Sequence, residues 1–183
     1  VLMERPGYDP LAGAARLLGA HIVRFERRFE DDFTLDPDAV ARAMTPRTRL
    51  IIINSPHNPT GAVADRSALE AIGQIAAAAG AHVLVDEVYL DAAEPARQPA
   101  ALLGDPSTSP FISTSSLTKS YGLSSLRCGW TISSPAVAER TKERTNERPG
   151  DPVVDRAIAR PADRAAVRAI DRAIEASDDS ASA

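Results

Sequence analysis

Residues 113–130 hold the residue types best suited to chemistry in this chain. Lys119 stands among serine and threonine hydroxyls, and Arg127 follows eight residues later. An amine can form a Schiff base with a carbonyl, while a guanidinium and hydroxyls can bind an anion such as a phosphate. The pattern therefore indicates a site that holds a phosphate and offers an amine to a carbonyl. A solvated loop is the alternative, since loops also favour Ser, Thr, Lys and Gly.

Two other polar clusters follow apolar runs in the same way. Residues 54–61 (Asn-Ser-Pro-His-Asn-Pro-Thr-Gly) come after the run 49–53, and residues 86–89 (Asp-Glu-Val-Tyr) come after 82–85. Uninterrupted apolar runs suit strands that are buried on both faces, as in a parallel sheet. Ligands bind at the carboxyl ends of strands in open α/β sheets, so we expect these clusters and residues 113–119 to form one site.

The elements that must position these clusters alternate between strand and helix. Strands are expected over 1–4, 21–25, 49–53, 82–85, 111–113 and 128–133. Helices are expected over 11–18, 38–44, 65–79 and 136–144, with an irregular connection over 91–110. Asp36 is a candidate cap for the second helix, and Pro37 suits its first turn. This alternation predicts an α/β fold, a three-layer domain with a mainly parallel central sheet.

The composition is that of an ordinary globular protein. The 183 residues are 44% hydrophobic and 25% charged, which suits one domain with a core of its own. A net charge of -4 gives no general attraction to nucleic acid or to an anionic membrane, so neither is expected as a partner. The single cysteine, Cys128, excludes an internal disulfide framework and fits a reducing compartment, so we expect a cytoplasmic protein.

The two ends of the chain differ from its middle. The first four residues resemble a strand already under way, which leads us to expect a fragment of a longer protein. Residues 141–176 predict a polar helical tail, in which Asp-Arg-Ala recurs every eight residues from Asp155. Solvated helices are favoured there over a partner-binding element, because the apolar stripe is thin. Residues 177–183 are expected to be disordered.

Three segments together resemble the signature of an enzyme family. Residues 54–61, 85–89 and 116–129 are similar to the three signature segments of the class I/II aminotransferases, which are fold type I enzymes dependent on pyridoxal 5'-phosphate (PLP). The resemblance implies that residues 1–140 form a partial PLP-binding large domain. It also implies transamination between an amino acid and a 2-oxo acid, by a homodimer.

The resemblance gives two residues the central roles. Lys119 is the expected catalytic residue: its amine would bind the cofactor and later move a proton between the substrate Cα and the cofactor C4'. The other lysine, Lys142, lies in the polar tail region. Asp86 would pair with the protonated pyridine nitrogen, which would also satisfy a carboxylate at the end of an apolar strand. A surface lysine and a turn cap are the structural alternatives.

The same resemblance assigns the other cofactor contacts. Asn58 and Tyr89 match the family's partners of the phenolic oxygen, and Ser116 and Arg127 match its phosphate ligands. Tyr8 matches the aromatic residue that stacks on the cofactor ring. An ordinary turn is the alternative for the segment around Asn58, and an ordinary half-buried tyrosine is the alternative for Tyr8.

The histidines receive no catalytic role. We expect His57 to be a solvated loop histidine rather than a residue lining the site, and His21 and His82 to be structural because they open strands. The three histidines and Cys128 are too scattered for metal-ligand spacing, so no metal site is expected.

Two classes of function remain open. The first is an aminotransferase, or a sibling PLP lyase or decarboxylase. The second is an inactive remnant or binding module that keeps the cofactor motifs without turnover. The cofactor-contacting residues favour the first. The second is favoured because the sequence has no match for two family features: a small-residue phosphate loop, expected before Val1, and an arginine for the substrate carboxylate.

Overall fold

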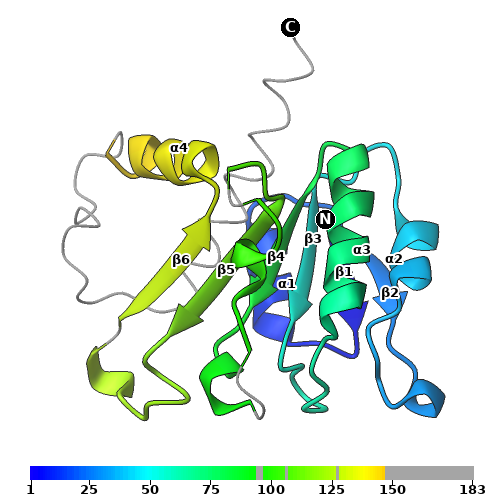
Figure 1. Cartoon of the computed structure of the whole chain (residues 1–183), viewed down its shortest axis with the longest axis horizontal. Helices are drawn as coiled ribbons and strands as arrows, with labels where there is room; N and C mark the ends of the chain where they lie inside the picture. The colour runs from blue at the N-terminus through cyan, green and yellow to red at the C-terminus, as the bar shows by residue number, and fades with distance from the viewer. Residues whose placement is uncertain (94–96, 106, 127, 147–183) are drawn as a thin grey trace, which may run out of the picture.

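The structure is a computed structural model that describes residues 1–93, 97–105, 107–126 and 128–146. Over these residues the chain forms a six-stranded sheet with helices on both faces (Figure 1). The strands are β1 (Leu2–Arg5), β2 (Val23–Glu26), β3 (Leu50–Asn54), β4 (His82–Asp86), β5 (Phe111–Ser116) and β6 (Gly129–Ser133). The helices are α1 (Asp9–Leu17), α2 (Pro37–Ala43), α3 (Arg66–Ala78) and α4 (Pro135–Asn146). The expected tail after residue 146 and the expected disordered end at 177–183 lie outside the described residues.

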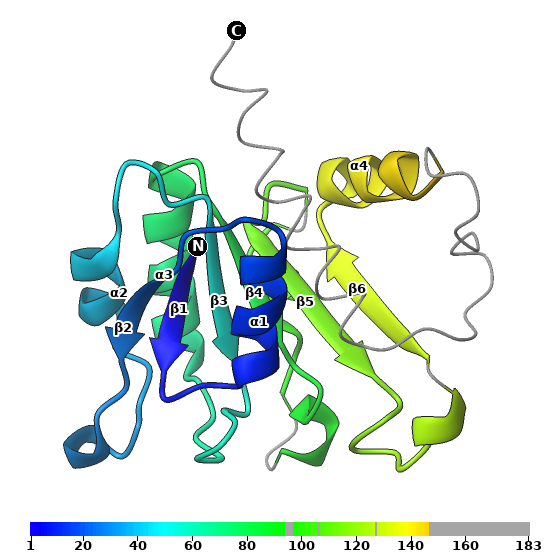
Figure 2. The same cartoon turned by 180° about the vertical axis from the view of Figure 1, so that it is seen from behind.

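The strands lie in the order β2-β1-β3-β4-β5-β6. Strands β1 to β5 are parallel, and β6 is antiparallel to β5. Helix α1 covers one face of the sheet and α2 and α3 cover the other, as two opposite views show (Figures 1 and 2). The predicted three-layer α/β fold with a mainly parallel sheet is therefore confirmed. The strand order reverses beside β1, and such a reversal is where doubly wound sheets bind ligands.

Strand β3 contributes to the apolar cores on both faces of the sheet. Ile51 and Ile53 belong to the core that includes Val40 of α2 and Ile72 of α3. Ile52, which lies between them, belongs to the core formed with α1. Successive side chains of a strand point to opposite faces, so a strand covered on both sides must be apolar throughout. This explains the uninterrupted apolar run in the sequence.

Several element boundaries follow the expected signals. The Oδ1 atom of Asp36 accepts a hydrogen bond from the backbone N–H of Asp38 at 2.8 Å, which caps α2. Gly19 and Gly80 follow α1 and α3 with φ of 79° and 62°, a conformation that glycine adopts without steric cost. Strand β5 is longer than predicted and runs to Ser116, because its polar second half pairs with β6.

The expected irregular connection at 91–110 is only partly irregular. Short 3-10 turns form at Leu90–Ala92 and Ala100–Leu102. Ala100 and Ala101 are buried in the core on the α2 and α3 face. This connection therefore packs against the sheet.

Gly73 lies where α3 approaches β5. A Cβ atom at Gly73 would be 2.8 Å from Cε2 of the buried Phe111 ring, whereas a Cβ at Gly13 in α1 would meet nothing within 4 Å. We expect Gly73→Ala to lower the free energy of unfolding by about 1 kcal/mol, because overpacking outweighs the gain in helix propensity. Gly13→Ala should raise it by about 0.5–1 kcal/mol. Urea denaturation followed by circular dichroism measures both, and equal gains would contradict the packing argument.

Candidate active site

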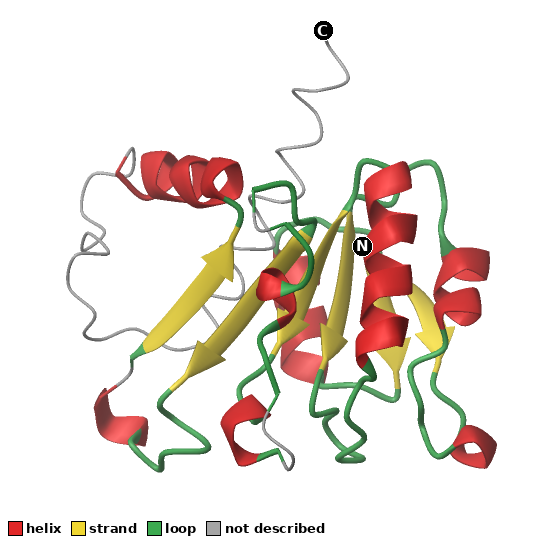
Figure 3. Cartoon of the chain, in the orientation of Figure 1, coloured by secondary structure: helices red, strands yellow, loops and turns green. Residues whose placement is uncertain are grey.

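The three polar clusters lie at the edge of the sheet where the parallel strands end. The loops that leave β1, β3, β4 and β5 gather there, at the lower edge in Figure 3. Asn54 of β3 is paired in register with Asp86 of β4, and Asp86 with Thr114 of β5. Three neighbouring strands therefore bring polar side chains next to each other at this edge.

Asp86 has a carboxylate in a defined orientation. Its Oδ2 atom accepts a hydrogen bond from Nδ2 of Asn54 at 2.9 Å. Its Oδ1 atom accepts a second bond from the backbone N–H of Val88 at 3.3 Å, which is a turn contact. A hydrogen bond from β3 thus orients one oxygen of Asp86, and a hydrogen bond from the turn after β4 orients the other.

Lys119 lies in the turn after β5, and its side chain is exposed. The N–H of Gly122 donates to the carbonyl of Lys119 at 3.0 Å and closes this turn. The hydroxyl of Ser120 donates to the carbonyl of Val88 at 3.0 Å. This bond connects the turn of Lys119 to the segment that follows Asp86.

Ser116 ends β5 and is buried. Its hydroxyl lies 2.6 Å from Oγ1 of Thr118 and accepts a bond from the N–H of Thr118 at 3.4 Å. The predicted phosphate contact Arg127 lies outside the described residues.

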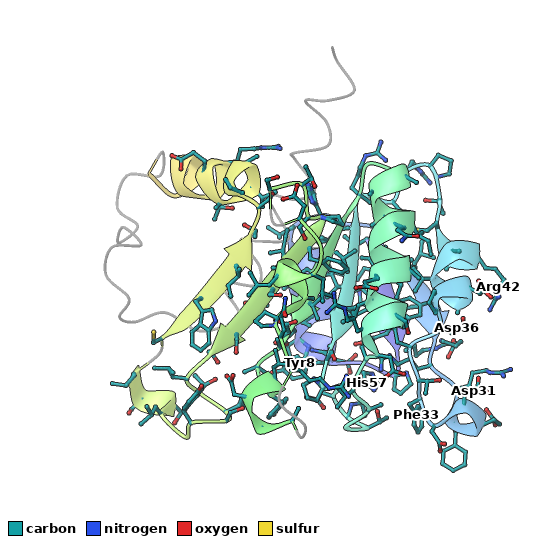
Figure 4. The ribbon with its side chains drawn as sticks, viewed as in Figure 1. Tyr8, Asp31, Phe33, Asp36, Arg42 and His57 are labelled. Carbon is teal, nitrogen blue, oxygen red and sulfur yellow. The ribbon has the colours of Figure 1, made fainter. Side chains whose placement is uncertain are left out.

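The other predicted site residues belong to loops at the same edge. Asn58 is half-buried in the loop after β3, and Tyr89 is half-buried three residues after the end of β4. Tyr8 directly precedes α1, makes no side-chain capping bond to it, and packs against the core on the α1 face. Figure 4 shows Tyr8 and His57 at this edge of the sheet. The fold thus collects the described candidates from the ends of four strands.

His57 corrects one expectation, because it is a buried residue and not a solvated loop histidine. Only 2% of it is exposed. Its Nε2 donates to the carbonyl of Pro6 at 3.0 Å, and its Nδ1 accepts from the hydroxyl of Thr60 at 2.6 Å. Burial and the nearby charge of Arg27 lower the pKa of His57 to about 4. The neutral ring therefore ties the loop after β1 to the loop after β3.

The structure also contains a buried ion pair that the sequence analysis missed. Nε of Arg27 lies 2.9 Å from Oε2 of Glu4, and their side chains are 0% and 3% exposed. Nη1 of Arg27 also donates to the carbonyl of Phe33 at 3.1 Å. Burial raises the pKa of Glu4 to about 7, although the guanidinium of Arg27 opposes the shift. One sign of this pair is visible in the sequence, because Glu4 is a charged residue that directly follows the apolar residues 1–3 in a predicted strand.

Glu87, the residue after Asp86, is buried without being one of the predicted contacts. Its Oε1 atom accepts from the N–H of Ala100 at 2.7 Å, so it anchors the connection between β4 and β5. Burial raises the pKa of Glu87 to about 7, and the hydrogen bonds from Ala100 and Ser113 oppose the shift. The folded chain therefore holds a proton on Glu87 at pH values where the unfolded chain has released it.

Glu87→Gln should change stability in a pH-dependent way. The pKa of Glu87 is about 7 in the folded chain and ordinarily 4.5, so the contribution of Glu87 to stability is fully present below pH 4.5 and is lost as the pH rises through 7. Glutamine keeps the acceptor for Ala100 and has no charge to bury. We expect the variant to be more stable than the wild type by about 1–3 kcal/mol at pH 8, with little difference at pH 4.5. Urea denaturation at both pH values tests this, and an equal effect at both would contradict it.

Two features are absent from the described residues, a metal-holding cluster and a membrane-spanning helix. No group of three or more His, Cys, Asp or Glu side chains there is arranged to hold a metal ion. None of the described helices is long and apolar enough to cross a membrane.

Comparison with known proteins identifies similar sequences. The family described as "Aminotransferase class I and II" matches residues 1–175. A probable N-succinyldiaminopimelate aminotransferase of Mycobacterium tuberculosis is 41% identical over 132 residues, which are 71% of this chain and 33% of the relative. An aspartate/prephenate aminotransferase of Thermus thermophilus is 42% identical over 89 residues, which are 49% of this chain and 23% of the relative. The chain spans a third or less of the length of these curated relatives.

Solved structures show similarity over nearly the whole chain. The N-succinyldiaminopimelate aminotransferase of Mycobacterium tuberculosis matches with a TM-score of 0.69 and 34% identity, over 93% of this chain and 43% of that one. A PLP-dependent aminotransferase of Streptococcus suis matches with a TM-score of 0.71 and 28% identity, over 96% of this chain and 45% of that one. The similarity therefore holds in three dimensions as well as in sequence.

Proposed function

Because this chain belongs to the class I and II aminotransferase family, we propose that it functions in transamination between an amino acid and a 2-oxo acid, with PLP as its cofactor. One arrangement carries the proposal. Asp86 ends β4, the turn with Lys119 follows the neighbouring β5, and the bond from Ser120 to Val88 joins the two segments. A carboxylate and an exposed amine thus belong to the ends of adjacent parallel strands.

The side chains at this edge suit PLP chemically. An aldehyde needs an amine, a pyridine nitrogen that carries a proton needs a carboxylate, and a phosphate needs hydroxyl and guanidinium donors. Lys119 would supply the amine, Asp86 the carboxylate and Ser116 a hydroxyl. The guanidinium would come from Arg127, which the family resemblance assigns and which lies outside the described residues. The bonds from Asn54 and Val88 hold the carboxylate of Asp86 in one orientation at this edge. The residues therefore fit the cofactor.

The chemistry would be divided between the cofactor and the residues around it. Bound at this edge, PLP would supply an electron sink for the charge left on the substrate Cα. Lys119 would hold the cofactor through its amine. Once the substrate amine had displaced it, the freed amine would move a proton from the substrate Cα to C4' of the cofactor. Asp86 would keep the pyridine nitrogen protonated. Asn58 and Tyr89 would bind the phenolic oxygen, and Tyr8 would lie against the ring.

The proposal extends to the partners of the protein. The substrates would be an amino acid and a 2-oxo acid, and the names of the relatives include N-succinyldiaminopimelate, aspartate and prephenate. A homodimer is supported by Tyr121, Leu123 and Leu126 in the connection between β5 and β6, which are 44–50% exposed. Contact with a second copy would remove this apolar surface from water. The free thiol of Cys128 agrees with a reducing compartment such as the cytoplasm.

The experiment is a transamination assay on the purified chain. The chain is incubated with PLP, a panel of amino acids and 2-oxoglutarate, and the new amino acid and 2-oxo acid are quantified by chromatography. We expect both products, in equal amounts, only when PLP is present. PLP binding without product would favour a binding module, and release of carbon dioxide or of a side-chain fragment would favour a decarboxylase or a lyase.

A further inference from the structure

Asn54 is the residue that directs one oxygen of Asp86. It is the last residue of β3 and is 3% exposed. Its Nδ2 atom donates to Oδ2 of Asp86 at 2.9 Å. Hydrogen bonds to a carboxylate stabilise its ionised form. An amide does so without adding a charge, so it orients the carboxylate and leaves its negative charge in place.

The backbone of Asn54 is held from the opposite side by the buried ion pair. Its N–H donates to Oε1 of Glu4 at 2.7 Å, and its carbonyl accepts from Nη2 of Arg27 at 3.4 Å. Glu4 belongs to β1, and Arg27 directly follows β2. The pair therefore connects the ends of β1, β2 and β3 at the point where the strand order reverses.

We propose that Asn54 is a positioning residue for Asp86, with its backbone fixed by Glu4 and Arg27 and its amide fixing the carboxylate. A chain of contacts then leads from the buried ion pair through Asn54 to Asp86. The expected effect of Asn54 on PLP binding rests on the proposed function, in which Asp86 pairs with the pyridine nitrogen of the cofactor. The contact between Asn54 and Asp86 can be tested without any cofactor.

The first test uses the cofactor-free chain. Asn54→Ala removes the amide and keeps the backbone bonds to Glu4 and Arg27, while Asn54→Asp keeps the shape and replaces the donor by a second carboxylate. The pKa of Asp86 is measured by carbon NMR titration, with Asp86→Asn to assign the signal. We expect Asn54→Ala to raise it by about one unit, and Asn54→Asp to raise it further because like charges repel.

Thr114→Val is the matched control. Thr114 is paired in register with Asp86 on its other side, but its hydroxyl donates to the carbonyl of Trp130 at 3.4 Å. The pKa of Asp86 should not change in this variant. If the Asn54 variants do not fold, the side-chain amide protons of Asn54 in the wild type provide the same test. Their chemical shifts should follow the titration of Asp86, and shifts that stay constant would overturn the proposal.

The second test measures PLP binding. We expect Asn54→Ala to weaken the binding of PLP about tenfold, the effect of losing one hydrogen bond to a charged group, and Thr114→Val to leave it unchanged. If the wild type does not bind PLP, the proposed function fails, while the NMR titration still decides the role of Asn54. If the wild type binds PLP but Asn54→Ala leaves the titration of Asp86 unchanged, the role of Asn54 is refuted and the proposed function stands.

Discussion

Arg27→Met is expected to lower the free energy of unfolding by about 3–5 kcal/mol at pH 8, because it leaves Glu4 buried without its counter-ion. Both side chains are almost inaccessible to water, and the pair also holds the backbone of Asn54. Urea denaturation followed by circular dichroism gives the value. The loss should be smaller at pH 5, where Glu4, with a pKa of about 7 in the wild type, can take up a proton and avoid the buried charge.

Arg5→Met is the control for this effect. Arg5 forms an ion pair with Glu26 across the same two strands, but its side chain is 68% exposed. Exposed pairs contribute about 0–1 kcal/mol, so this variant should be nearly as stable as the wild type. The double variant Glu4→Gln with Arg27→Met should recover part of the loss, since it no longer buries a lone charge. A loss in Arg27→Met no larger than that in Arg5→Met would show that the pair is not buried as described.

Lys119→Ala is expected to reduce the rate of transamination by about a hundred- to ten-thousandfold, because the amine that moves the proton is lost. The rate is measured with PLP and both substrates at saturation. Lys142→Ala is a matched control, since the sequence contains only these two lysines. The control should keep the wild-type rate. Turnover that survives in Lys119→Ala would remove this residue from the reaction.

The fold could be predicted from the sequence because its signals are local. Apolar runs such as 49–53 predicted strands that are covered on both faces, and Asp36 with Pro37 predicted the start of α2. The end of β5 was missed because Ser115 and Ser116 carry no apolar signal. These two residues belong to β5 because they pair with β6, and this pairing cannot be read from the sequence.

The placement of the site residues at the strand ends also followed from the sequence, but their supports did not. Asp86 was found because it follows an apolar run, and Lys119 because it stands among serine and threonine hydroxyls. His57 and the pair of Glu4 and Arg27 are buried by contacts between the ends of β1, β2 and β3. Those contacts depend on β1 lying between β2 and β3 in the sheet, an arrangement that spacing along the chain does not specify.

Covalent trapping shows directly whether Lys119 binds PLP. The chain is loaded with PLP, reduced with borohydride, digested and mapped by mass spectrometry. We expect a phosphopyridoxyl group on the peptide that contains Lys119, and none in Lys119→Ala. Modification of Lys142 or of the Val1 amine instead, or no modification at all, would show that Lys119 does not bind PLP.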